Sequence, residues 1–413
     1  MFQITTTILL VTSSIITLIQ ILFSNNRIIK KLNALIVLTC LISWFIFPTP
    51  KNLCHEPNQQ FQSNQPRKYR LLARKLSSTG LILVGEINMG QSGPEVRFLR
   101  CDHSLLGGFW IGPAKRSIIK RHKELYPNHP LNNAELELRA AKEAESIYPT
   151  FILQDAIRLV ERPSQTLYQK PSALILGLGV GISAHSLMRH GALVTVAEID
   201  PIVYEYAQKF FALPTPNGGI FLEDARYYLQ RAVNGSLGLF DYIIHDVFTG
   251  GTVPSSLFTV ECWKGIRNKL KDDGILAVNF AGEPQTETWT LVLTTLFHVF
   301  PFCRAFNEKV PQETLDYNFQ NIVIFCSPTS LPRFRKPTRN DVFGSRHRFE
   351  ILNTFETLEF NLTQHHIYRN PNSAFILFDR YKDRLEKAQM ESAFRHWKIM
   401  RQVLPDEVWH TYY

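Results

Sequence analysis

The feature that most constrains the fold of this chain is a regular alternation of short apolar runs and helical runs beyond Pro171. The apolar runs occupy residues 173–179, 193–200, 219–225, 240–248 and 274–280. They lack the polar–apolar alternation of a half-exposed strand, so each strand is expected to be buried on both faces. Strands of this kind pair into a sheet that helices cover on both sides. The sequence therefore predicts an α/β fold with a doubly wound, mostly parallel sheet.

A glycine-rich turn follows the first of these strands. Gly177, Gly179 and Gly181 occupy alternate positions directly before a predicted helix. Glycine permits a tight turn at such a place and lets a ligand approach the backbone closely. The turn therefore predicts a nucleotide-binding domain of the Rossmann-like kind.

Acidic residues end the strands that follow. Glu198, Asp224 and Asp246 end the second, third and fourth strands, which is where open α/β sheets bind their ligands. Acids at strand ends also cap helices, and this structural role is expected above all for Asp200, because Pro201 follows it. Taken together with the glycines, the acids are interpreted as one ligand site.

Two classes of nucleoside suit this pattern. The glycine spacing lacks the third glycine of the dinucleotide fingerprint, which favours an S-adenosyl nucleoside over NAD. Glu198 is then expected to accept hydrogen bonds from the ribose hydroxyls. Asp224, with Ala225 beside it, is expected to meet the adenine amino group. An NAD-dependent oxidoreductase stays the alternative at this point.

Asp246 is the candidate for catalysis. A sulfonium nucleoside carries its own leaving group, so the protein has mainly to align a nucleophile for attack. A carboxylate at the end of the fourth strand can orient an incoming amine and accept its proton. The neighbouring His245 is the weaker candidate, because side chains alternate along a strand and His245 is expected on the other face.

The N-terminus differs in character from the rest of the chain. Residues 4–23 and 32–48 carry no charge, and Arg27, Lys30 and Lys31 lie between them. Twenty helical residues span roughly 30 Å, the thickness of a bilayer core. The pattern predicts a two-pass helical hairpin, with a single span or a cleaved signal peptide as alternatives. We expect an integral, multi-pass membrane protein in contact with the lipid bilayer, with its catalytic domain in the cytosol.

Composition changes divide the chain into five predicted segments. They are a transmembrane hairpin at 1–50, a linker at 51–79, a small β-domain at 80–130, the Rossmann-like catalytic domain at 131–327 and a C-terminal extension at 328–413. The last part of the extension reads as an amphipathic helix that packs on the domain, with apolar positions at Phe394, Trp397, Met400 and Leu404.

Charge and cysteine content limit the classes of partner that the chain is expected to bind. The formal net charge is +9, which permits contact with an anionic membrane surface, and no nucleic-acid partner is expected. The six cysteines are scattered and form no metal-ligand spacing, so no metal site is predicted. A reducing compartment suits this cysteine usage.

Eight segments together resemble one known family. They read LVGEIN, VRFLRCDHSLLGGFW, SIYPTFILQ, LILGLGVGI, VAEIDP, LEDAR, DYIIHDVF and GILAVNF, and they extend over roughly residues 80 to 326. The chain is similar to the spermidine/spermine synthases, which are polyamine aminopropyltransferases with a class I methyltransferase-like fold. The two apolar runs and the tail resemble a membrane-anchored, fungal-type branch of that family.

The resemblance implies a co-substrate and an acceptor site. The co-substrate would be S-adenosylmethionine or its decarboxylated form, and the acceptor a small amine or another nucleophile. Tyr148 matches an aromatic residue that lines the acceptor site in the family, although a core tyrosine is an equally good reading. Family members often dimerise through the β-domain, so a homodimer is a further expectation.

The chain departs from the family pattern at two carboxylates. Val180 stands where spermidine synthases carry the aspartate that holds the aminopropyl amine. In the acceptor loop the first aspartate is kept as Asp246, whereas the second is replaced by Thr249. Losing a charged partner weakens ammonium binding by about 1.5–3 kcal/mol per hydrogen bond. Methyl transfer to another acceptor is therefore nearly as well supported as polyamine synthesis, and a non-catalytic, ligand-binding or scaffold protein is the alternative to an enzyme.

Overall fold

The structure is a computed structural model. It describes residues 69–88, 95–111, 145–164, 169–231, 239–247, 252–308, 319–362, 373–404 and 406–410. These residues all belong to one compact unit, Gln65–Tyr413. The predicted linker residues 51–68, and the acceptor-loop residue Thr249, lie outside them.

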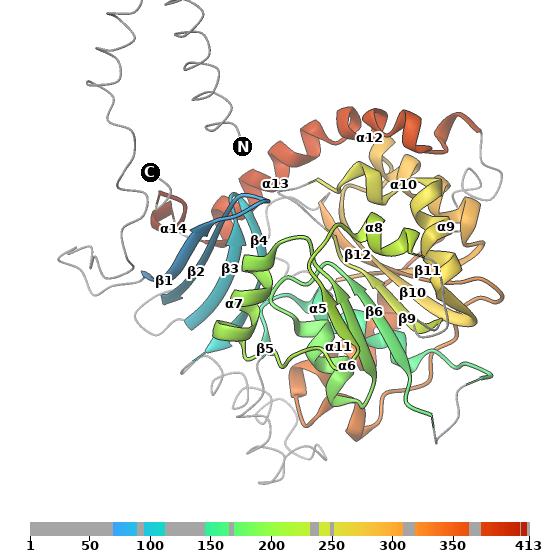
Figure 1. Ribbon diagram of the computed structural model, residues 1–413, viewed down its shortest axis with the longest axis horizontal. Coiled ribbons are helices and arrows are strands. Elements are labelled where there is room, and N and C mark those ends of the chain that lie inside the picture. The colour runs from blue at the N-terminus through green and yellow to red at the C-terminus, as the bar shows by residue number, and fades with distance from the viewer. Residues whose placement is uncertain are drawn as a thin grey trace, which may run out of the picture. The chain divides into compact units, whose positions relative to one another are not determined.

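A small antiparallel sheet begins the described chain (Figure 1). Its strands, in spatial order, are β1 (Tyr69–Leu76), β2 (Leu81–Asn88), β3 (Glu95–Cys101), β4 (Ser104–Ile111) and β5 (Glu145–Ser146). Each strand pairs with the next one along the chain, as a meander does. β1 lies within the segment predicted as a linker. Its charged residues Arg70 and Lys75 make the sequence look unlike a strand, and the strand forms through backbone pairing with β2.

The large sheet has eight strands and is mixed. The order is β13-β11-β12-β10-β9-β6-β7-β8. Its parallel part consists of β6 (Ser172–Leu176), β7 (Leu193–Ala197), β8 (Gly219–Phe221), β9 (Phe240–His245) and β10 (Leu270–Gly282). The strands β11 (Phe302–Asn307), β12 (Gln320–Ser327) and β13 (Glu359–Phe360) extend it with antiparallel pairs. The five predicted strands form the parallel part, so the α/β prediction is confirmed.

Helices cover both faces of the large sheet (Figure 1). One face packs against α8 (Ala225–Gln230), α9 (Val260–Lys269) and α10 (Glu287–Val299). The other packs against α5 (Pro149–Leu153), α6 (Ile182–Arg189) and α11 (Arg346–Thr354). Along β6, Leu174 and Leu176 belong to the first core, whereas Ala173 and Ile175 belong to the second. This arrangement explains why the strand sequences are apolar at consecutive positions.

The helix α7 (Pro201–Phe211) connects the large sheet to the small one. Its apolar residues Ile202, Val203 and Phe211 share a core with Ile82 and Phe109 of the small sheet. Asp200 caps the helix by accepting hydrogen bonds from the backbone N–H groups of the next turn. The expected capping role of Asp200 is therefore confirmed.

The C-terminal extension returns to the small sheet. It ends with α12 (Asp383–Ala388), α13 (Met390–Val403) and α14 (Asp406–His410). Its 3-10 turns lie at Arg339–Val342, Phe355–Leu358, Ser373–Phe375 and Asp379–Tyr381, and two more occur earlier in the chain, at Gln154–Leu159 and Ser255–Leu257. Met400, Leu404 and Trp397 of this extension pack with Leu83 and other apolar residues of the small sheet. The predicted amphipathic helix is confirmed, except that Phe394 is 59% exposed.

The predicted membrane localisation must be corrected. The helices in the described part of the chain are all too short or too polar to cross a bilayer, which contradicts an integral, multi-pass membrane protein. The apolar runs at 4–23 and 32–48, on which the prediction rested, lie outside the described residues. The expected lipid contact and homodimer receive no support from the structure.

A disulfide joins Cys303 of β11 to Cys326 of β12. The two residues are 23 positions apart in sequence and directly opposite each other in the antiparallel register. Sequence reasoning treated each cysteine as isolated, because only the antiparallel pairing of β11 with β12 brings the two together. A disulfide is unexpected for the reducing compartment that the cysteine usage suggested.

Candidate active site

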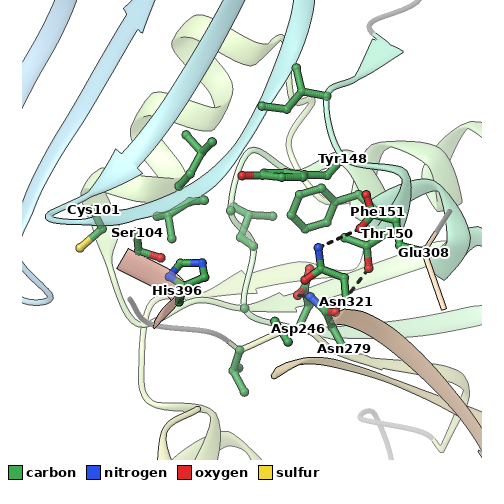
Figure 2. Close-up of a pocket in the computed structure, with 18 of the residues that line it drawn as sticks. Cys101, Ser104, Tyr148, Thr150, Phe151, Asp246, Asn279, Glu308, Asn321 and His396 are labelled. Carbon is green, nitrogen blue, oxygen red and sulfur yellow. Dashed lines mark hydrogen bonds between the residues drawn. The ribbon is translucent and has the colours of Figure 1, made fainter. Parts of the chain in front are cut away.

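A cavity of about 1250 Å³ lies at the carboxyl ends of the parallel strands. The small sheet closes one side of it, and the helices α11 and α13 of the C-terminal extension contribute Ile351 and Met400 to the wall. Figure 2 shows part of its lining, with residues that are far apart in sequence facing one space. The cavity is larger than a pocket for one small ligand, which usually measures about 300–1,000 Å³.

The glycine turn forms part of this lining. Gly177 and Gly179 line the cavity, and both have left-handed backbone conformations. A Cβ atom at Gly179 would lie 2.6 Å from the carbonyl oxygen of Leu106 in β4, and one at Gly177 would meet the carbonyl oxygen of Asp246. Gly181 instead packs against the side chain of Leu213 and does not belong to the lining. The glycines thus also serve close packing against other parts of the protein, in addition to the tight turn and the ligand approach expected from the sequence.

Glu198 follows β7 and is buried beneath the turn. Its carboxylate accepts hydrogen bonds from the backbone N–H of Leu178, at 2.8 Å, and from that of Asp200, at 2.9 Å. The side chain is 6% exposed, and burial raises the pKa of the carboxyl to about 7. Glu198 therefore both fixes the glycine turn and presents an acceptor group to the cavity.

Asp224 and Ala225 lie where the sequence pattern placed them. Both line the cavity, beyond the end of β8. Asp224 also caps α8, because one of its carboxylate oxygens accepts a hydrogen bond of 2.8 Å from the backbone N–H of Arg226. One acid thus has a structural role and faces the ligand space at the same time.

Asp246 sits at the end of β9 inside a polar cluster. Its Oδ1 accepts a hydrogen bond of 2.8 Å from Asn279 Nδ2, and Asn279 Oδ1 accepts one of 3.4 Å from the hydroxyl of Thr150. Burial raises the pKa of Asp246, and hydrogen bonds from Gln154 and Asn279 oppose that effect. The hydrogen bonds thereby hold the carboxylate in one orientation at the cavity, while the backbone carbonyl of Asp246 lies against Gly177.

A second carboxylate, which sequence reasoning missed, lies in the same region. Glu308 follows β11 and accepts a hydrogen bond of 2.8 Å from Asn321 Nδ2 at the start of β12. Burial raises the pKa of Glu308 to about 7. Figure 2 shows Glu308, Asn321 and Thr150 together on the side of the cavity that holds Asp246. The position of Glu308 directly after an apolar strand was the available signal, but the strand itself was not predicted.

Aromatic residues form the wall beside these acids. Tyr148 and Phe151 pack edge to face, with ring centroids 5.9 Å apart, and both line the cavity. The Tyr148 hydroxyl points to Met400 Sδ at 3.8 Å, and burial raises the pKa of the tyrosine. Tyr148 therefore combines the two readings that the sequence left open, a packed core residue and a wall of the site.

The candidate His245 is separate from the cavity. Its Nε2 atom lies 3.1 Å from the Leu257 carbonyl oxygen, and its ring packs against Phe258 and Trp263. The side chain is fully buried, and burial lowers its pKa to about 4. The expectation that it points to the other face of the strand is confirmed.

Val180 is also turned away from the ligand space. Its side chain is 3% exposed and packs in the core that α7 shares with the small sheet. A methyl group of Val180 touches the position where Gly107 would carry a Cβ. Position 180 therefore supplies no carboxylate to the cavity.

The lining of the cavity is strongly acidic, although the chain as a whole is basic. Within the described part of the chain the lining includes seven carboxylates, Asp102, Glu198, Asp200, Asp224, Asp246, Glu308 and Glu350, and neither lysine nor arginine. Burial lowers the pKa of the lining histidines His103, His347 and His396, which keeps them neutral near pH 7. A cationic ligand is favoured here, whereas the pyrophosphate of NAD would be repelled.

A family signature covers the middle of the chain. The pattern of the spermine/spermidine synthase domain matches residues 155–313. This chain therefore carries a segment similar to the spermine/spermidine synthase domain. The match ends just beyond Glu308, so it excludes the C-terminal helices that close the cavity.

Individual proteins that are similar to this chain extend the comparison. An N-terminal histidine N-methyltransferase of Emericella nidulans is 38% identical over 353 residues, which are 83% of this chain and 58% of that protein. A polyamine aminopropyltransferase of Vibrio vulnificus is 32% identical over 164 residues, which are 38% of this chain and 51% of that protein. A probable spermidine synthase of known structure from Corynebacterium glutamicum has a TM-score of 0.47 and 17% identity, and covers 68% of this chain and 87% of its own. The chain thus spans about half the length of the first two relatives.

Proposed function

We propose that this protein is a methyltransferase that uses S-adenosylmethionine and modifies the N-terminal histidine of a polypeptide. The observation that supports this most is one cavity in which the glycine turn and Glu198 face the same space as Asp246 and the aromatic wall. The acceptor class comes from the Emericella nidulans relative, whose match spans both the family domain and the C-terminal extension.

The residues present suit an S-adenosyl donor. Gly177 and Gly179 line the cavity at the end of β6, and Glu198 offers a buried carboxylate at the end of β7 for hydroxyl groups. The acidic lining favours a positively charged sulfonium. Bound there, S-adenosylmethionine supplies a methyl group on a sulfur that leaves readily. The missing carboxylate at Val180 disfavours the aminopropyl donor, which needs an anchor for its ammonium group.

The acceptor side suits an imidazole ring. Tyr148 and Phe151 provide aromatic surfaces against which a ring can stack. In the transfer, the acceptor nitrogen forms a bond to the methyl carbon while the carbon–sulfur bond breaks and leaves its electron pair on sulfur. The attacking nitrogen of a neutral imidazole carries no proton, so the methylated ring loses its proton from the other ring nitrogen. Asp246 accepts that proton, and Asn279 holds the carboxylate in place.

A methyl-transfer assay tests the proposal. The full chain is incubated with isotope-labelled S-adenosylmethionine and a peptide that begins with histidine. We expect label on the first residue, and no label on a peptide in which the same histidine is internal. Asp246→Asn should lower kcat about 100-fold while donor binding is kept, because general-base catalysis contributes roughly 10²–10⁴-fold. Aminopropyl transfer to putrescine from the decarboxylated donor, without methyl transfer to the peptide, would overturn the proposal.

A further inference from the structure

We infer that Glu308 binds the positively charged α-amino group of the acceptor's first residue, while Asp246 serves the imidazole ring that receives the methyl group. This inference rests on the proposed function, and it adds a residue that defines why the histidine must be N-terminal. In a chain interior the same nitrogen is an amide, which carries no charge and has only one hydrogen to donate.

The Glu308 carboxylate is placed by backbone and side-chain contacts of two neighbouring strands. Its side chain accepts the hydrogen bond from Asn321, and the backbone N–H of Glu308 donates to the Asn321 carbonyl oxygen at 2.9 Å. The backbone N–H of Thr150 also hydrogen-bonds the carboxylate. Hydrogen bonds from two separate segments, at Asn321 and Thr150, therefore hold the carboxylate at the cavity wall, and the backbone contact with Asn321 fixes the residue that carries it.

Glu308 and Asp246 lie on the same patch of that wall. Thr150 contacts Glu308 through its backbone and Asn279 through its hydroxyl, and Asn279 donates to Asp246. Figure 2 shows these residues grouped beneath the rings of Tyr148 and Phe151. A histidine at a chain terminus carries its amine and its imidazole a few bonds apart. One such residue can therefore place its amine at Glu308 and its imidazole at Asp246, because only Thr150 and Asn279 connect the two carboxylates.

The surroundings of Glu308 favour a cationic ligand group. The described lining of the cavity offers it neither a lysine nor an arginine, and its hydrogen-bond partners Asn321 and Thr150 are neutral. A buried carboxylate without a positive partner is costly, and an ammonium group relieves that cost. Glu308 thereby restores an acceptor carboxylate to a chain whose family motif has lost one at Thr249.

The test compares two peptides on two variants. One peptide begins with histidine, and the other begins with the des-amino analogue, which keeps the imidazole and lacks the α-amine. We expect Glu308→Gln to weaken binding and kcat/KM for the first peptide by about 10- to 100-fold, the range for a hydrogen bond between charged groups. The second peptide should bind the wild-type protein and Glu308→Gln equally. Glu161→Gln, a change at an exposed acid outside the cavity, is the matched control and should change neither value.

Binding and turnover are measured separately, so that the two proposals can fail independently. Peptide binding is followed by calorimetry with S-adenosylhomocysteine present, which needs no turnover. If the wild-type protein binds both peptides equally, or Glu308→Gln weakens both equally, the role of Glu308 is overturned even where methyl transfer is observed. If no peptide is methylated but the amine-dependent binding depends on Glu308, the methyltransferase proposal fails and the recognition site stands.

Discussion

The Glu198 carboxylate lies under the glycine turn and accepts hydrogen bonds from two backbone N–H groups. Sequence reasoning placed this acid at the site from its position at a strand end. It did not anticipate the burial, because the carboxylate is enclosed only once the glycine turn and the backbone at Asp200 fold around it. The same holds for Asp246, whose partners Asn279 and Thr150 come from segments distant in sequence.

Glu198 makes donor binding dependent on pH. Burial raises the pKa of Glu198 from 4.5 in its ordinary state to about 7. The folded state therefore binds an extra proton between these values, and the stability that Glu198 contributes is lost as pH rises through that window. The ionised carboxylate is the better acceptor for hydroxyl groups, so we expect the affinity for S-adenosylmethionine to rise with pH across about pH 6–8.

Calorimetry on Glu198→Gln checks this expectation. The variant should bind the donor about 10- to 100-fold more weakly at high pH and should show a flatter pH dependence. Glu223→Gln is the control, since Glu223 pairs with Arg231 and does not line the cavity. A pH dependence that persists unchanged in Glu198→Gln would show that another group is responsible.

At the scale of elements, the parallel strands and their helices were predictable, because their apolar runs are bounded by glycines and acids. The edge strands were not. β1 carries charged residues, and β13 has only two residues, Glu359–Phe360, so their pairing depends on neighbours supplied by the rest of the fold. The strand β11, which positions Glu308, has no bounding signal that distinguishes it from a loop. The disulfide was missed because one of its cysteines, Cys303, lies in this unpredicted strand.

The glycine turn depends on its fit against β4. Gly179→Ala would place a Cβ 2.6 Å from the Leu106 carbonyl oxygen at a φ of +55°. We expect a loss of about 1–3 kcal/mol in unfolding free energy and weaker donor binding, because the turn must shift. Gly191→Ala is a matched control, since that glycine has a φ of +84° and no atom within 4 Å of the added Cβ.

Urea unfolding and donor titration separate the two effects. Gly191→Ala should lower the unfolding free energy by only about 1 kcal/mol, which is the cost of a left-handed backbone conformation for alanine, and should leave donor affinity unchanged. If Gly179→Ala behaves in the same way, the contact with Leu106 is not what requires glycine there.

The Cys303–Cys326 bond should stabilise the antiparallel edge of the large sheet. The bond joins residues that are 23 positions apart, so it closes a loop in the unfolded chain and restricts its freedom. Reduction is therefore expected to lower the unfolding free energy by roughly 2–4 kcal/mol. The measurement is urea unfolding with and without reductant, with a Cys303→Ala/Cys326→Ala double variant that should not respond to reductant. Free reactivity of both thiols in the unreduced, unfolded protein would contradict the bond.

At the scale of the whole molecule, a basic chain encloses an acidic cavity. The net charge of +9 resides outside the described lining of the site, which has seven carboxylates and no lysine or arginine. Net charge alone therefore does not indicate the charge of the ligand, because the local field at a cleft is set by the groups that line it. Three parts of the chain, the small sheet, the large sheet and the C-terminal extension, each contribute walls to one cavity.

Titration of the full chain with S-adenosylmethionine by calorimetry tests the central claim most directly. We predict saturable binding with one donor per chain, and the same affinity for Asp246→Asn, because that carboxylate serves the acceptor. Weak or absent binding of NAD is expected under the same conditions. Absence of S-adenosylmethionine binding, or preferential binding of NAD or of the decarboxylated donor, would contradict the account.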